Sequence, residues 1–456
     1  MNKQIVIIGA GITGLATAHW LKKDGLNVTV FEANAGVGGS MVTEKNDGYL
    51  IDFGPNSGLE TSPLIKTLVD DLNLNEKFIY ANKEGNKRYI LRNNNLNELP
   101  MSFKSFLSTK LFSTKAKLRL GLEPFIGKSK DGYNQSISEF VTRRLGQEFL
   151  DYAINPFVAG VYAGNPDKLS VKSAFPKLYR LEELYGGLIK GTIKGARERK
   201  KSGEKSKQNA AMFSFTDGMA TLPLALHKEL VDNIILNANV TSIDKSNNKY
   251  QVIYTHNNSQ NIIEADLVVS TAPSYVTADI FKNMDNELSN HLNKIYYPPV
   301  MVLYLGYNKQ VVGHPLDGFG FLIPSKEKKK FLGALWSSVI FNERAPKDKA
   351  SFTIFIGGAR SPELFNDDNK KLINEVIIEF ETLMKISGKY DFMKYKFWNK
   401  AIPQYNIGYN EHASYFLKFE EANKGIILGG NYVGGISVGD CIKSSDVLYN
   451  KVKESL

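Results

Sequence analysis

A short glycine-rich stretch near the start of the chain carries the clearest chemical signal. Four apolar residues, Ile5 to Ile8, run directly into Gly9, Gly11 and Gly14 with the spacing GxGxxG. A buried strand that turns tightly into a helix at such glycines lets backbone N–H groups and the positive helix end face a pyrophosphate. The spacing therefore predicts a dinucleotide-binding turn.

An acidic residue follows this turn at the end of the next predicted strand, where it could bind a ribose. Glu32 comes directly after a second predicted strand, Asn27 to Phe31, and a predicted helix that ends at Gly25 separates the two strands. A carboxylate in this place accepts hydrogen bonds from ribose hydroxyls and repels a 2′-phosphate. We therefore expect an unphosphorylated adenosine ribose and no NADP. The alternative is a structural glycine turn without a ligand.

Three further glycine-rich segments extend the predicted cofactor site: Gly36 to Ser40, Gly54 to Ser57, and Gly429 to Asp440. The last one follows a predicted strand and opens the last predicted helix. Domains that bind only NAD do not usually need these additions. With them the sequence resembles the FAD-binding flavoproteins of the glutathione-reductase type, and in particular the flavin amine oxidase and porphyrinogen oxidase branch.

Length and composition predict a globular protein with two or three lobes. The chain has 456 residues, of which 43% are hydrophobic and 23% are charged, and these values exclude wholesale disorder. No uncharged apolar run is long enough to span a bilayer, and the first strand begins where a signal peptide would stand. The single cysteine, Cys441, cannot form an internal disulfide. We therefore expect a cytoplasmic protein.

The net charge of +10 suggests an anionic partner without identifying it. An anionic substrate and an anionic lipid surface both fit, whereas the sequence has no nucleic-acid-binding motif, so we expect no nucleic-acid partner. The six histidines match no catalytic or metal-binding motif. We therefore expect no metal, and no catalytic residue is identified by the sequence.

The order of the predicted elements indicates an α/β fold in which a split, Rossmann-like FAD-binding domain is interrupted by two insertions. Its three parts are residues 1–91, 212–282 and 417–456. Residues 283–416 contain apolar, β-branched and aromatic runs between turns, which predict an antiparallel-sheet substrate lobe with a helix over residues 368–384. Residues 92–211 are mainly helical and basic.

The basic insertion admits two interpretations. Apolar residues such as Phe103 and Leu107 alternate with lysines such as Lys104 and Lys110 between residues 101 and 125. Core packing is the first interpretation, and contact with a membrane surface is the second. The cation-rich run at residues 194–207 is predicted to be a solvated loop, with contact to anionic lipid as the alternative.

Four longer segments make the resemblance specific over almost the entire chain. They are residues 138–166 (SEFVTRRLGQEFLDYAINPFVAGVYAGNP), 319–324 (FGFLIP), 402–405 (IPQY) and 434–443 (GGISVGDCIK). In these segments the chain resembles the family of oxygen-dependent protoporphyrinogen oxidases and coproporphyrinogen III oxidases. The resemblance implies FAD bound without a covalent link.

The resemblance also implies which residues contact the cofactor. Gly9, Gly11 and Gly14 would hold the pyrophosphate, Glu32 the ribose, and Val240 the adenine. The complete implied set is Gly9, Ala10, Gly11, Gly14, Glu32, Ala33, Gly39, Gly54, Pro55, Asn56, Ser57, Val240, Trp398, Gly435, Ile436 and Ser437. For Trp398, core packing is an equal alternative to a place near the flavin.

On the substrate side the resemblance implies four residues. Gly320 and Leu322 belong to the segment that packs on the tetrapyrrole, and Leu335 falls on the next strand. Leucines on strands are more often core residues than ligand contacts. Lys104 stands where many relatives have an arginine that meets a substrate propionate. A lysine keeps the charge of that arginine but loses its bidentate fork.

The implied function is FAD-dependent oxidation of a porphyrinogen to a porphyrin in heme biosynthesis, with O₂ as acceptor and H₂O₂ as product. The carbon bridges of a porphyrinogen have no easily ionised proton, so a hydride acceptor is required. Protoporphyrinogen IX is the first expected substrate. Coproporphyrinogen III is the alternative, and Lys104 with Arg92 could serve its additional propionates.

Three further expectations concern other partners. A lipid carrier without redox chemistry on the same fold is the alternative function from another class. The basic insertion leads us to expect peripheral binding to the inner face of the plasma membrane. The sequence leaves a homodimer open.

Overall fold

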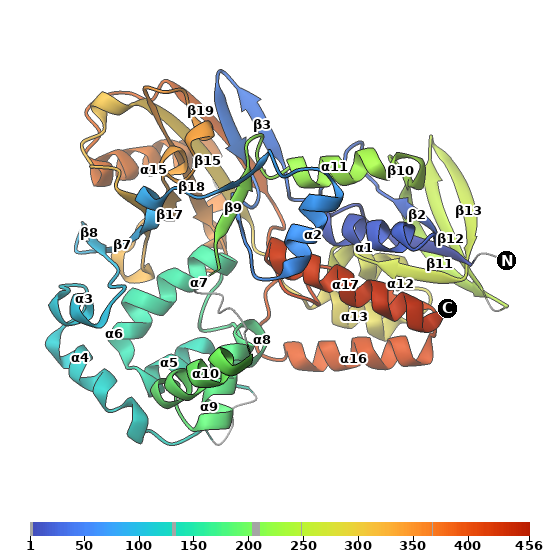
Figure 1. The fold of residues 1–456 in the computed structure, drawn as a ribbon, viewed down its shortest axis with the longest axis horizontal. Coiled ribbons are helices and arrows are strands. Elements are labelled where there is room, and N and C mark those ends of the chain that lie inside the picture. Colours follow the sequence, from blue (N-terminus) through green and yellow to red (C-terminus); the bar gives the residue numbers. More distant parts are fainter. Residues whose placement is uncertain (1–2, 130–133, 203–209, 248, 367) are drawn as a thin grey trace.

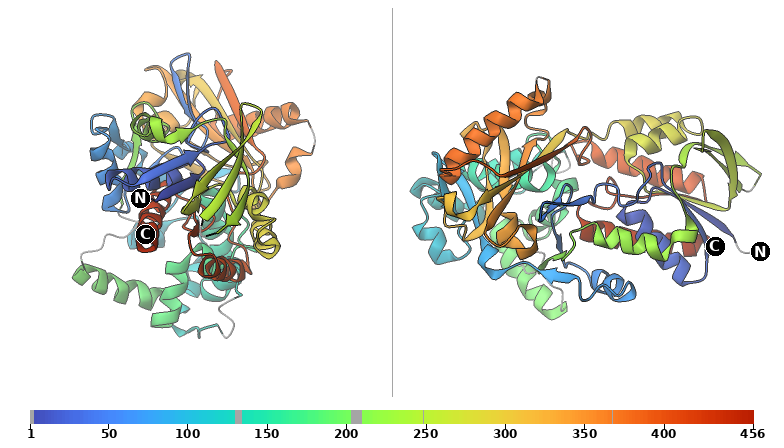
Figure 2. Two further views of the ribbon diagram at one scale, coloured as in Figure 1. Left: turned by 90° about the vertical axis from the view of Figure 1, so that its right-hand side faces the viewer. Right: turned by 90° about the horizontal axis from the view of Figure 1, so that it is seen from above.

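The protein has two large parts joined side by side along its longest axis. We describe a computed structural model in which residues 3–129, 134–202, 210–247, 249–366 and 368–456 are placed. Figure 1 shows a part that contains both chain ends on the right and a second part, with a large sheet and a group of helices, on the left. The view from above in Figure 2 shows the same division.

A five-stranded parallel sheet forms the centre of the first part, with the strand order β10-β2-β1-β14-β20. Its strands are β1 (Gln4–Ile8), β2 (Asn27–Phe31), β10 (Ile234–Ile235), β14 (Leu267–Ser270) and β20 (Ile426–Leu428). Ile5 and Ile7 face one hydrophobic cluster, whereas Val6 and Ile8 face another. Both faces of the sheet are therefore covered, and this explains why β1 is apolar at every position after Gln4.

Helices lie on the two faces of this sheet. The first face packs against α1 (Ile12–Lys23), α2 (Pro63–Asp71), α11 (Thr221–Glu229) and α17 (Val438–Ser455). The second face packs against α12 (Ser274–Phe281), α13 (Asn286–Asn293), α16 (Tyr409–Ala422) and an antiparallel sheet of β11 (Asn239–Ser246), β12 (Lys249–His256) and β13 (Ser259–Ala265). The layered α/β arrangement confirms the predicted fold class.

Two small sheets connect the first part to the second. One pairs β3 (Thr43–Asn46) with β4 (Tyr49–Asp52), and the other has the order β5-β9-β6, formed by β5 (Gly58–Leu59), β9 (Met212–Phe215) and β6 (Phe78–Tyr80). The second small sheet joins segments on either side of the helical insertion. The chain thus leaves the first part and re-enters it at neighbouring strands, which is how an insertion is accommodated.

The second part is built on a seven-stranded sheet with the order β19-β15-β18-β17-β16-β7-β8. Its strands are β7 (Lys87–Arg92), β8 (Asn95–Glu98), β15 (Val300–Asn308), β16 (Gly318–Leu322), β17 (Phe331–Leu335), β18 (Lys349–Gly357) and β19 (Phe392–Trp398). The helix predicted at residues 368–384 is α15 (Asn369–Met384), which covers one face, and the short α14 (Ser337–Ile340) follows β17.

The pairing of β7 and β8 differs from the division made at residue 91. Residues 87–90 pair in parallel with β16 of the second sheet, and residues 89–92 pair with β8, so residues 87–98 belong to the substrate lobe. The physical reason is that β7 finds its partner more than two hundred residues away, and a short strand does not reveal such a partner locally.

Residues 103–202 form the predicted helical insertion, at the lower left of Figure 1. Its helices are α3 (Phe103–Ser108), α4 (Thr114–Gly121), α5 (Ile137–Arg144), α6 (Gln147–Phe149), α7 (Asn155–Tyr162), α8 (Val171–Ala174), α9 (Pro176–Tyr185) and α10 (Leu188–Ser202). The predicted loop at residues 194–207 is wrong for its first part, because α10 continues to Ser202. Residues 203–207 lie outside the described residues.

Candidate active site

The first glycine turn lies between β1 and α1, as the spacing predicts. Gly9 has a φ of +100°, and a Cβ atom on Gly14 would lie 2.1 Å from the Gly9 carbonyl oxygen. A Cβ atom on Gly11 would meet no heavy atom within 4 Å. The turn is therefore closed toward the protein at Gly14 and open at Gly11, where a pyrophosphate would approach the helix N-terminus.

Glu32 is held beside this turn by backbone donors. The Ala10 N–H donates to its Oε2 at 2.9 Å, and the Asn34 N–H donates to its Oε1 at 3.0 Å. The carboxylate is buried, whereas the neighbouring Ala33 is exposed. The Asn34 side-chain amide also donates to Oε1, at 2.6 Å. Because a carboxylate has about four acceptor positions, one position on Oε2 remains for a ribose hydroxyl.

The second glycine segment packs directly on the first. The Gly38 N–H donates to the Ala10 carbonyl at 2.8 Å, and Gly11 and Gly38 form an isolated parallel bridge. Gly39 has a φ of +59°, and a Cβ atom added there would lie 3.6 Å from the Gly11 Cα. Backbone rather than side chains therefore lines this side of the turn.

The parallel sheet brings the late glycine turn to the same edge. The carboxyl ends of β1, β14 and β20 lie together, and ligands of open α/β sheets bind outside such ends. The Thr271 hydroxyl donates to the Gly9 carbonyl at 3.0 Å, while a Cβ atom on Gly430 would lie 3.0 Å from the Thr271 carbonyl oxygen. Segments separated by more than four hundred residues thus meet at one place.

Gly435, Ile436 and Ser437 lead from this late turn into helix α17. Gly435 has a φ of +111°, and the Ser437 hydroxyl accepts the Asp440 N–H at 3.1 Å as the N-cap of the helix. Ile436 packs against the hydrophobic cluster of the second face. The N-termini of α1 and α17 both begin at the carboxyl edge of the sheet, so two positive helix ends serve one region.

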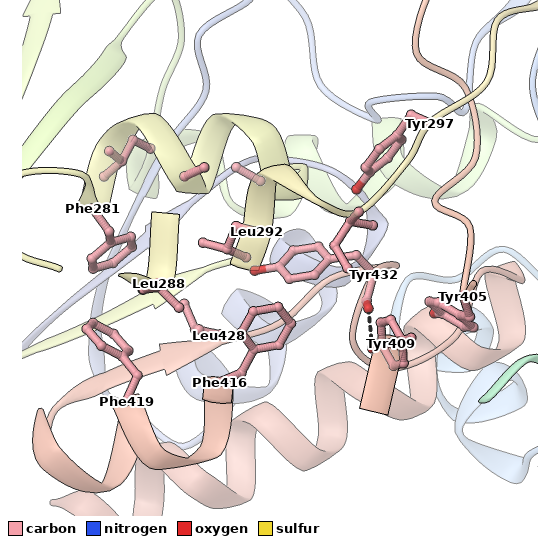
Figure 3. Packing of buried hydrophobic residues seen from close by; sticks show 14 of the residues in the cluster. Phe281, Leu288, Leu292, Tyr297, Tyr405, Tyr409, Phe416, Phe419, Leu428 and Tyr432 are labelled. Atoms are coloured by element: carbon pink, nitrogen blue, oxygen red, sulfur yellow. Dashed lines mark hydrogen bonds between the residues drawn. The ribbon is translucent and has the colours of Figure 1, made fainter. Parts of the chain in front are cut away.

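Buried tyrosines fix the backbone of the late turn (Figure 3). The Tyr405 hydroxyl donates to the Asn431 carbonyl, and the Tyr409 hydroxyl donates to the Tyr432 carbonyl. Burial raises the pKa of both Tyr405 and Tyr409 well above the usual range. These side chains therefore stay protonated as donors, and they position the turn without acting as bases.

The segment Gly54 to Ser57 continues the cofactor surface toward the second part. A Cβ atom on Gly54 would lie 1.8 Å from the Ser40 carbonyl oxygen, so this backbone packs on the second glycine segment. The Trp398 indole N–H donates to the Phe53 carbonyl at 2.8 Å. Trp398 thus supports this segment from the end of β19, and its place near the flavin stays a prediction.

Val240 lies on β11, close to Glu32. The Ala238 N–H donates to the Glu32 carbonyl at 2.9 Å, and Val240 itself is buried two residues later. Val240 is thus held near Glu32, and its contact with the adenine stays a prediction.

The glycines give the site a shape that fits the cofactor predicted for it. Side chains at Gly9, Gly14 or Gly54 would collide with backbone, whereas the backbone at Gly11 faces open space. Glu32 supplies the acceptor for a ribose, and two helix N-termini supply N–H groups for a pyrophosphate. The residues present therefore fit the adenosine diphosphate part of FAD.

Three of the four predicted substrate residues, Gly320, Leu322 and Leu335, share one face of the seven-stranded sheet. Gly320 pairs with Leu335, and Leu322 pairs with Gly333 two positions further along the strands. The alternate residues of these strands, such as Phe321 and Ala334, face the core under α15. A Cβ atom on Gly160 of α7 would lie 2.8 Å from Leu322 Cδ2, so α7 packs on the same face.

A hollow joins this face to the predicted cofactor site. Asn56 and Ser57 line it from one side, and Phe319 and Leu335 line it from the other. Below them the Arg344 guanidinium lies 3.2 Å from the Asp52 carboxylate, and both side chains are buried. Burial raises the pKa of Asp52 although Arg344 opposes this shift. The hollow therefore joins two predicted sets of residues that lie far apart in sequence.

Phe355 is a further residue of this face that the sequence did not identify. Its neighbours Ile354 and Ile356 are buried in the core under α15, whereas Phe355 is only partly buried and packs on the opposite face. On the adjacent strand its register partner is Gly333. Side chains alternate between the two faces of β18, so the sequence places Phe355 opposite Ile354 and Ile356. It does not tell which of these two faces is the core.

The two predicted propionate contacts have different environments. Lys104 is exposed on α3 and forms no ion pair with any residue that the structure describes. Arg92, in contrast, lies 2.6 Å from the Glu148 carboxylate and also stacks over the Tyr152 ring. The charge of Arg92 is thus already balanced, and Lys104 remains the freer cation of the two.

Within the described residues, no group of three or more histidine, cysteine, aspartate or glutamate side chains could hold a metal ion. Cys441 is buried near the late glycine turn, and burial raises the pKa of its thiol to about 11. The thiol therefore stays protonated at neutral pH.

Comparison with known proteins places this arrangement among flavoproteins. The family model described as "Flavin containing amine oxidoreductase" matches residues 12–446. Protoporphyrinogen oxidase 2 of Arabidopsis thaliana, which is chloroplastic and mitochondrial, is 37% identical to this chain over 97% of the chain and 92% of its own length. Coproporphyrinogen III oxidase of Bacillus subtilis is 28% identical over 97% and 96%.

The solved structures show the same fold. A protein from Exiguobacterium sp. that is provisionally named a protoporphyrinogen oxidase superposes with a TM-score of 0.82, at 21% identity, over all of both chains. At this level of identity the likeness concerns the fold, and it extends to both parts of the molecule.

Proposed function

The chain belongs to the family of flavin-containing amine oxidoreductases and uses FAD, and within this family we propose that it oxidises a porphyrinogen to a porphyrin in heme biosynthesis. The observation that carries this proposal is the hollow between Asn56 and Leu335, which joins the cofactor surface to an apolar sheet face. Relatives that match the whole chain are named for porphyrinogen oxidation. A lipid carrier without redox chemistry would not need this connection.

The chemistry divides between the cofactor and the chain. Bound FAD would supply the hydride acceptor for each two-electron oxidation of a carbon bridge, which also releases one proton, with O₂ as the final acceptor and H₂O₂ as the product. The chain holds the macrocyclic substrate on the apolar face of Gly320, Leu322 and Leu335. The tyrosines near the late turn act as hydrogen-bond donors to its backbone. The chain therefore positions the reactants and does not serve as a proton acceptor.

We favour protoporphyrinogen IX, which has two propionates, over coproporphyrinogen III, which has four. Four carboxylates would require several free cations near the sheet face, but Arg92 is already paired with Glu148. Lys326 is likewise paired, with Asp151 at 2.9 Å. The relative named for coproporphyrinogen keeps this substrate as the alternative.

Anaerobic mixing tests the proposal. The FAD-loaded protein is mixed with each porphyrinogen without oxygen, and the flavin absorbance near its visible maximum is followed. We expect rapid bleaching with protoporphyrinogen IX at a lower half-saturating concentration than with coproporphyrinogen III. Bleaching by neither substrate would refute the function, and a preference for the tetracarboxylate would replace the first substrate by the second.

We further propose that α3 and α4 bind an anionic membrane surface. Met101, Phe103, Leu118 and Phe125 are between 70% and 85% exposed, and Lys104 and Lys115 lie among them. Leu111 and Phe112 of the same stretch are buried, so the apolar pattern serves the core in one part and the surface in another. Among the described residues, no helix meets the length and hydropathy required to cross a bilayer.

Vesicle co-sedimentation tests this contact. We expect the protein to pellet with phosphatidylglycerol vesicles at low salt and to be released as salt rises, because exposed charges are screened. Replacing Phe103 and Phe125 by Ser should reduce the bound fraction. Leu224→Ser is the matched control, since Leu224 is 56% exposed on α11 of the other part. Equal binding of all three proteins would contradict the proposal.

A further inference from the structure

Arg360 is a partly buried cation without an acidic partner. It follows β18 and the Gly357–Gly358 turn, and no carboxylate of the described residues lies within ion-pair distance of its guanidinium. Its Nη1 donates to Asn155 Oδ1 at 2.8 Å, and both Nη atoms donate to the Ile323 carbonyl at 3.2 and 3.1 Å. All of these acceptors are neutral.

This environment is unfavourable for a charge that has only a structural role. Burial lowers the pKa of Arg360 to about 10, and no neighbouring charge contributes to the shift. The other strongly buried arginines have carboxylate partners, Arg144 with Glu123 and Glu182, and Arg344 with Asp52. Holding a charge away from water without a counter-ion costs free energy. An incoming anion would recover that cost.

The position of Arg360 relates it to the sheet face described above. Ile323, whose carbonyl it contacts, directly follows Leu322, which packs under α7. The Ala359 N–H donates to the Ala163 carbonyl at the end of α7, while Asn155 lies at its beginning. Arg360 therefore lies along the same helix that covers the predicted substrate face, at the end of β16 remote from Asn56 and Ser57.

The helix at this point departs from regular geometry. Residues 150–154 form one turn of π-helix before α7, and Pro156 follows Asn155. Such π-turns occur frequently at functional sites, because they alter the direction of the following side chains. Here the irregular turn presents Asn155, which accepts both the Arg360 Nη1 donor and the Ser325 N–H. Asn155 thus fixes the guanidinium.

We propose that Arg360 binds a carboxylate of the substrate, at the end of the substrate face that is remote from Asn56 and Ser57. The inference rests on the proposed function, since a porphyrinogen with propionate side chains supplies the carboxylate. The guanidinium has five N–H donors in a fork that matches a carboxylate, and the bonds described use only those on Nη1 and Nη2. Arg360 would thereby provide the bidentate fork that Lys104 lacks.

The test compares a free acid with its ester in the FAD-loaded enzyme. Half-saturating concentrations for anaerobic flavin reduction are measured with protoporphyrinogen IX and with its dimethyl ester, for the wild type, Arg360→Gln and Arg360→Lys. For Arg360→Gln we expect an increase of about 10- to 100-fold for the acid, the range that a charge-assisted hydrogen bond predicts, and less than about 3-fold for the ester. Arg360→Lys should lie between the wild type and Arg360→Gln.

Lys326→Gln is the matched control, because Lys326 is an exposed cation of the neighbouring turn and is paired with Asp151. It should leave both substrates unchanged. Equal changes for acid and ester in Arg360→Gln, or no change, would overturn the assignment while the function stands. A wild type that is reduced by neither compound would refute the function instead. If Arg360→Gln does not retain FAD, Arg360→Lys decides, and a loss of about 3-fold or more restricted to the acid supports the proposal.

Discussion

The cofactor end and the substrate end of this molecule are held by different kinds of interaction. At the cofactor end backbone meets backbone: Gly14 lies against the Gly9 carbonyl, and Gly54 lies against the Ser40 carbonyl. At the substrate end long side chains span the gaps between elements, as Arg92 does to Glu148 and Arg360 does to Asn155.

This difference determines how each end responds to substitution and to solvent. Where backbone packs on backbone there is no room for a Cβ atom, so one added carbon must displace the neighbouring chain. Side-chain pairs tolerate exchange more gradually, and they depend on charge and therefore on pH. We expect substitutions at the cofactor end to abolish binding through steric clash, and substitutions at the substrate end to weaken binding gradually.

The largest expected effect is that of Gly14→Ala. Its Cβ atom would lie 2.1 Å from the Gly9 carbonyl oxygen and 2.6 Å from the Thr271 hydroxyl oxygen, and both are fixed by the sheet. We expect protein without bound flavin and a loss of unfolding free energy of about 3 kcal/mol or more, as for severe overpacking. Absorbance of the purified protein and urea unfolding measure both effects. Normal flavin content would break the comparison.

Gly11→Ala distinguishes an effect on FAD affinity from an effect on the stability of the fold. Nothing lies within 4 Å of the added Cβ atom, so we expect the unfolding free energy of the flavin-free protein to change by less than about 1 kcal/mol. FAD affinity should fall by about 10- to 100-fold, because the methyl group stands where the pyrophosphate approaches. Titration of apoprotein with FAD measures this loss. Gly36→Ala is the control, since Gly36 also has open space around it but lies outside the GxGxxG turn.

The same contrast explains what the sequence could predict. The GxGxxG turn, Glu32 and the late glycine turn could be predicted from local spacing. Each glycine is required by the backbone geometry of a few neighbouring residues. Their meeting at one edge also followed, since parallel strands share a carboxyl end. Arg360 and Phe355 did not stand out, because their meaning depends on which residues of distant strands and helices lie beside them.

Strand β7 shows the same limit for the fold. Besides the adjacent β8, its partner is β16, which lies more than two hundred residues later in the chain. A strand's intrinsic preference does not specify its neighbour, so the boundary drawn at residue 91 cut through the element. Similarly, α10 continued through a basic run expected to be a loop, because a run of lysines and arginines is compatible with a helix.

Leu335→Ala tests the substrate end with an intermediate effect. Leu335 lines the hollow together with Ser57 but is remote from the glycine turns. Removing most of its side chain should raise the half-saturating porphyrinogen concentration by about 10-fold, equivalent to about 1.4 kcal/mol of apolar contact. FAD affinity should stay unchanged. An equal loss of both affinities would show that the two ends are not independent.

The smallest expected effect concerns pH at the substrate end. Burial by itself would raise the pKa of Glu148. The Ser113 hydroxyl and Arg92 outweigh burial and lower this pKa below its usual value. A carboxyl group with a lowered folded-state pKa stabilises the fold above its unfolded pKa of about 4.3, and this contribution is lost as the pH falls through the folded-state pKa.

Because Glu148 accepts the Ser113 N–H at the start of α4 and the Arg92 guanidinium on β7, acid should loosen α4 from the sheet. We expect amide exchange in residues 114–121 to become faster by about 3- to 5-fold on acidification, after correction for intrinsic rates, as for the loss of about 1 kcal/mol. Glu148→Gln should show fast exchange already at neutral pH, whereas Glu98→Gln, an exposed change on β8, should behave as the wild type. At the glycine turn the Gly9 N–H donates to the Phe31 carbonyl rather than to a carboxylate, so exchange at Gly9 should stay constant over the same range. Parallel acceleration in both places would mean that one cooperative unit, rather than two differently held ends, responds to acid.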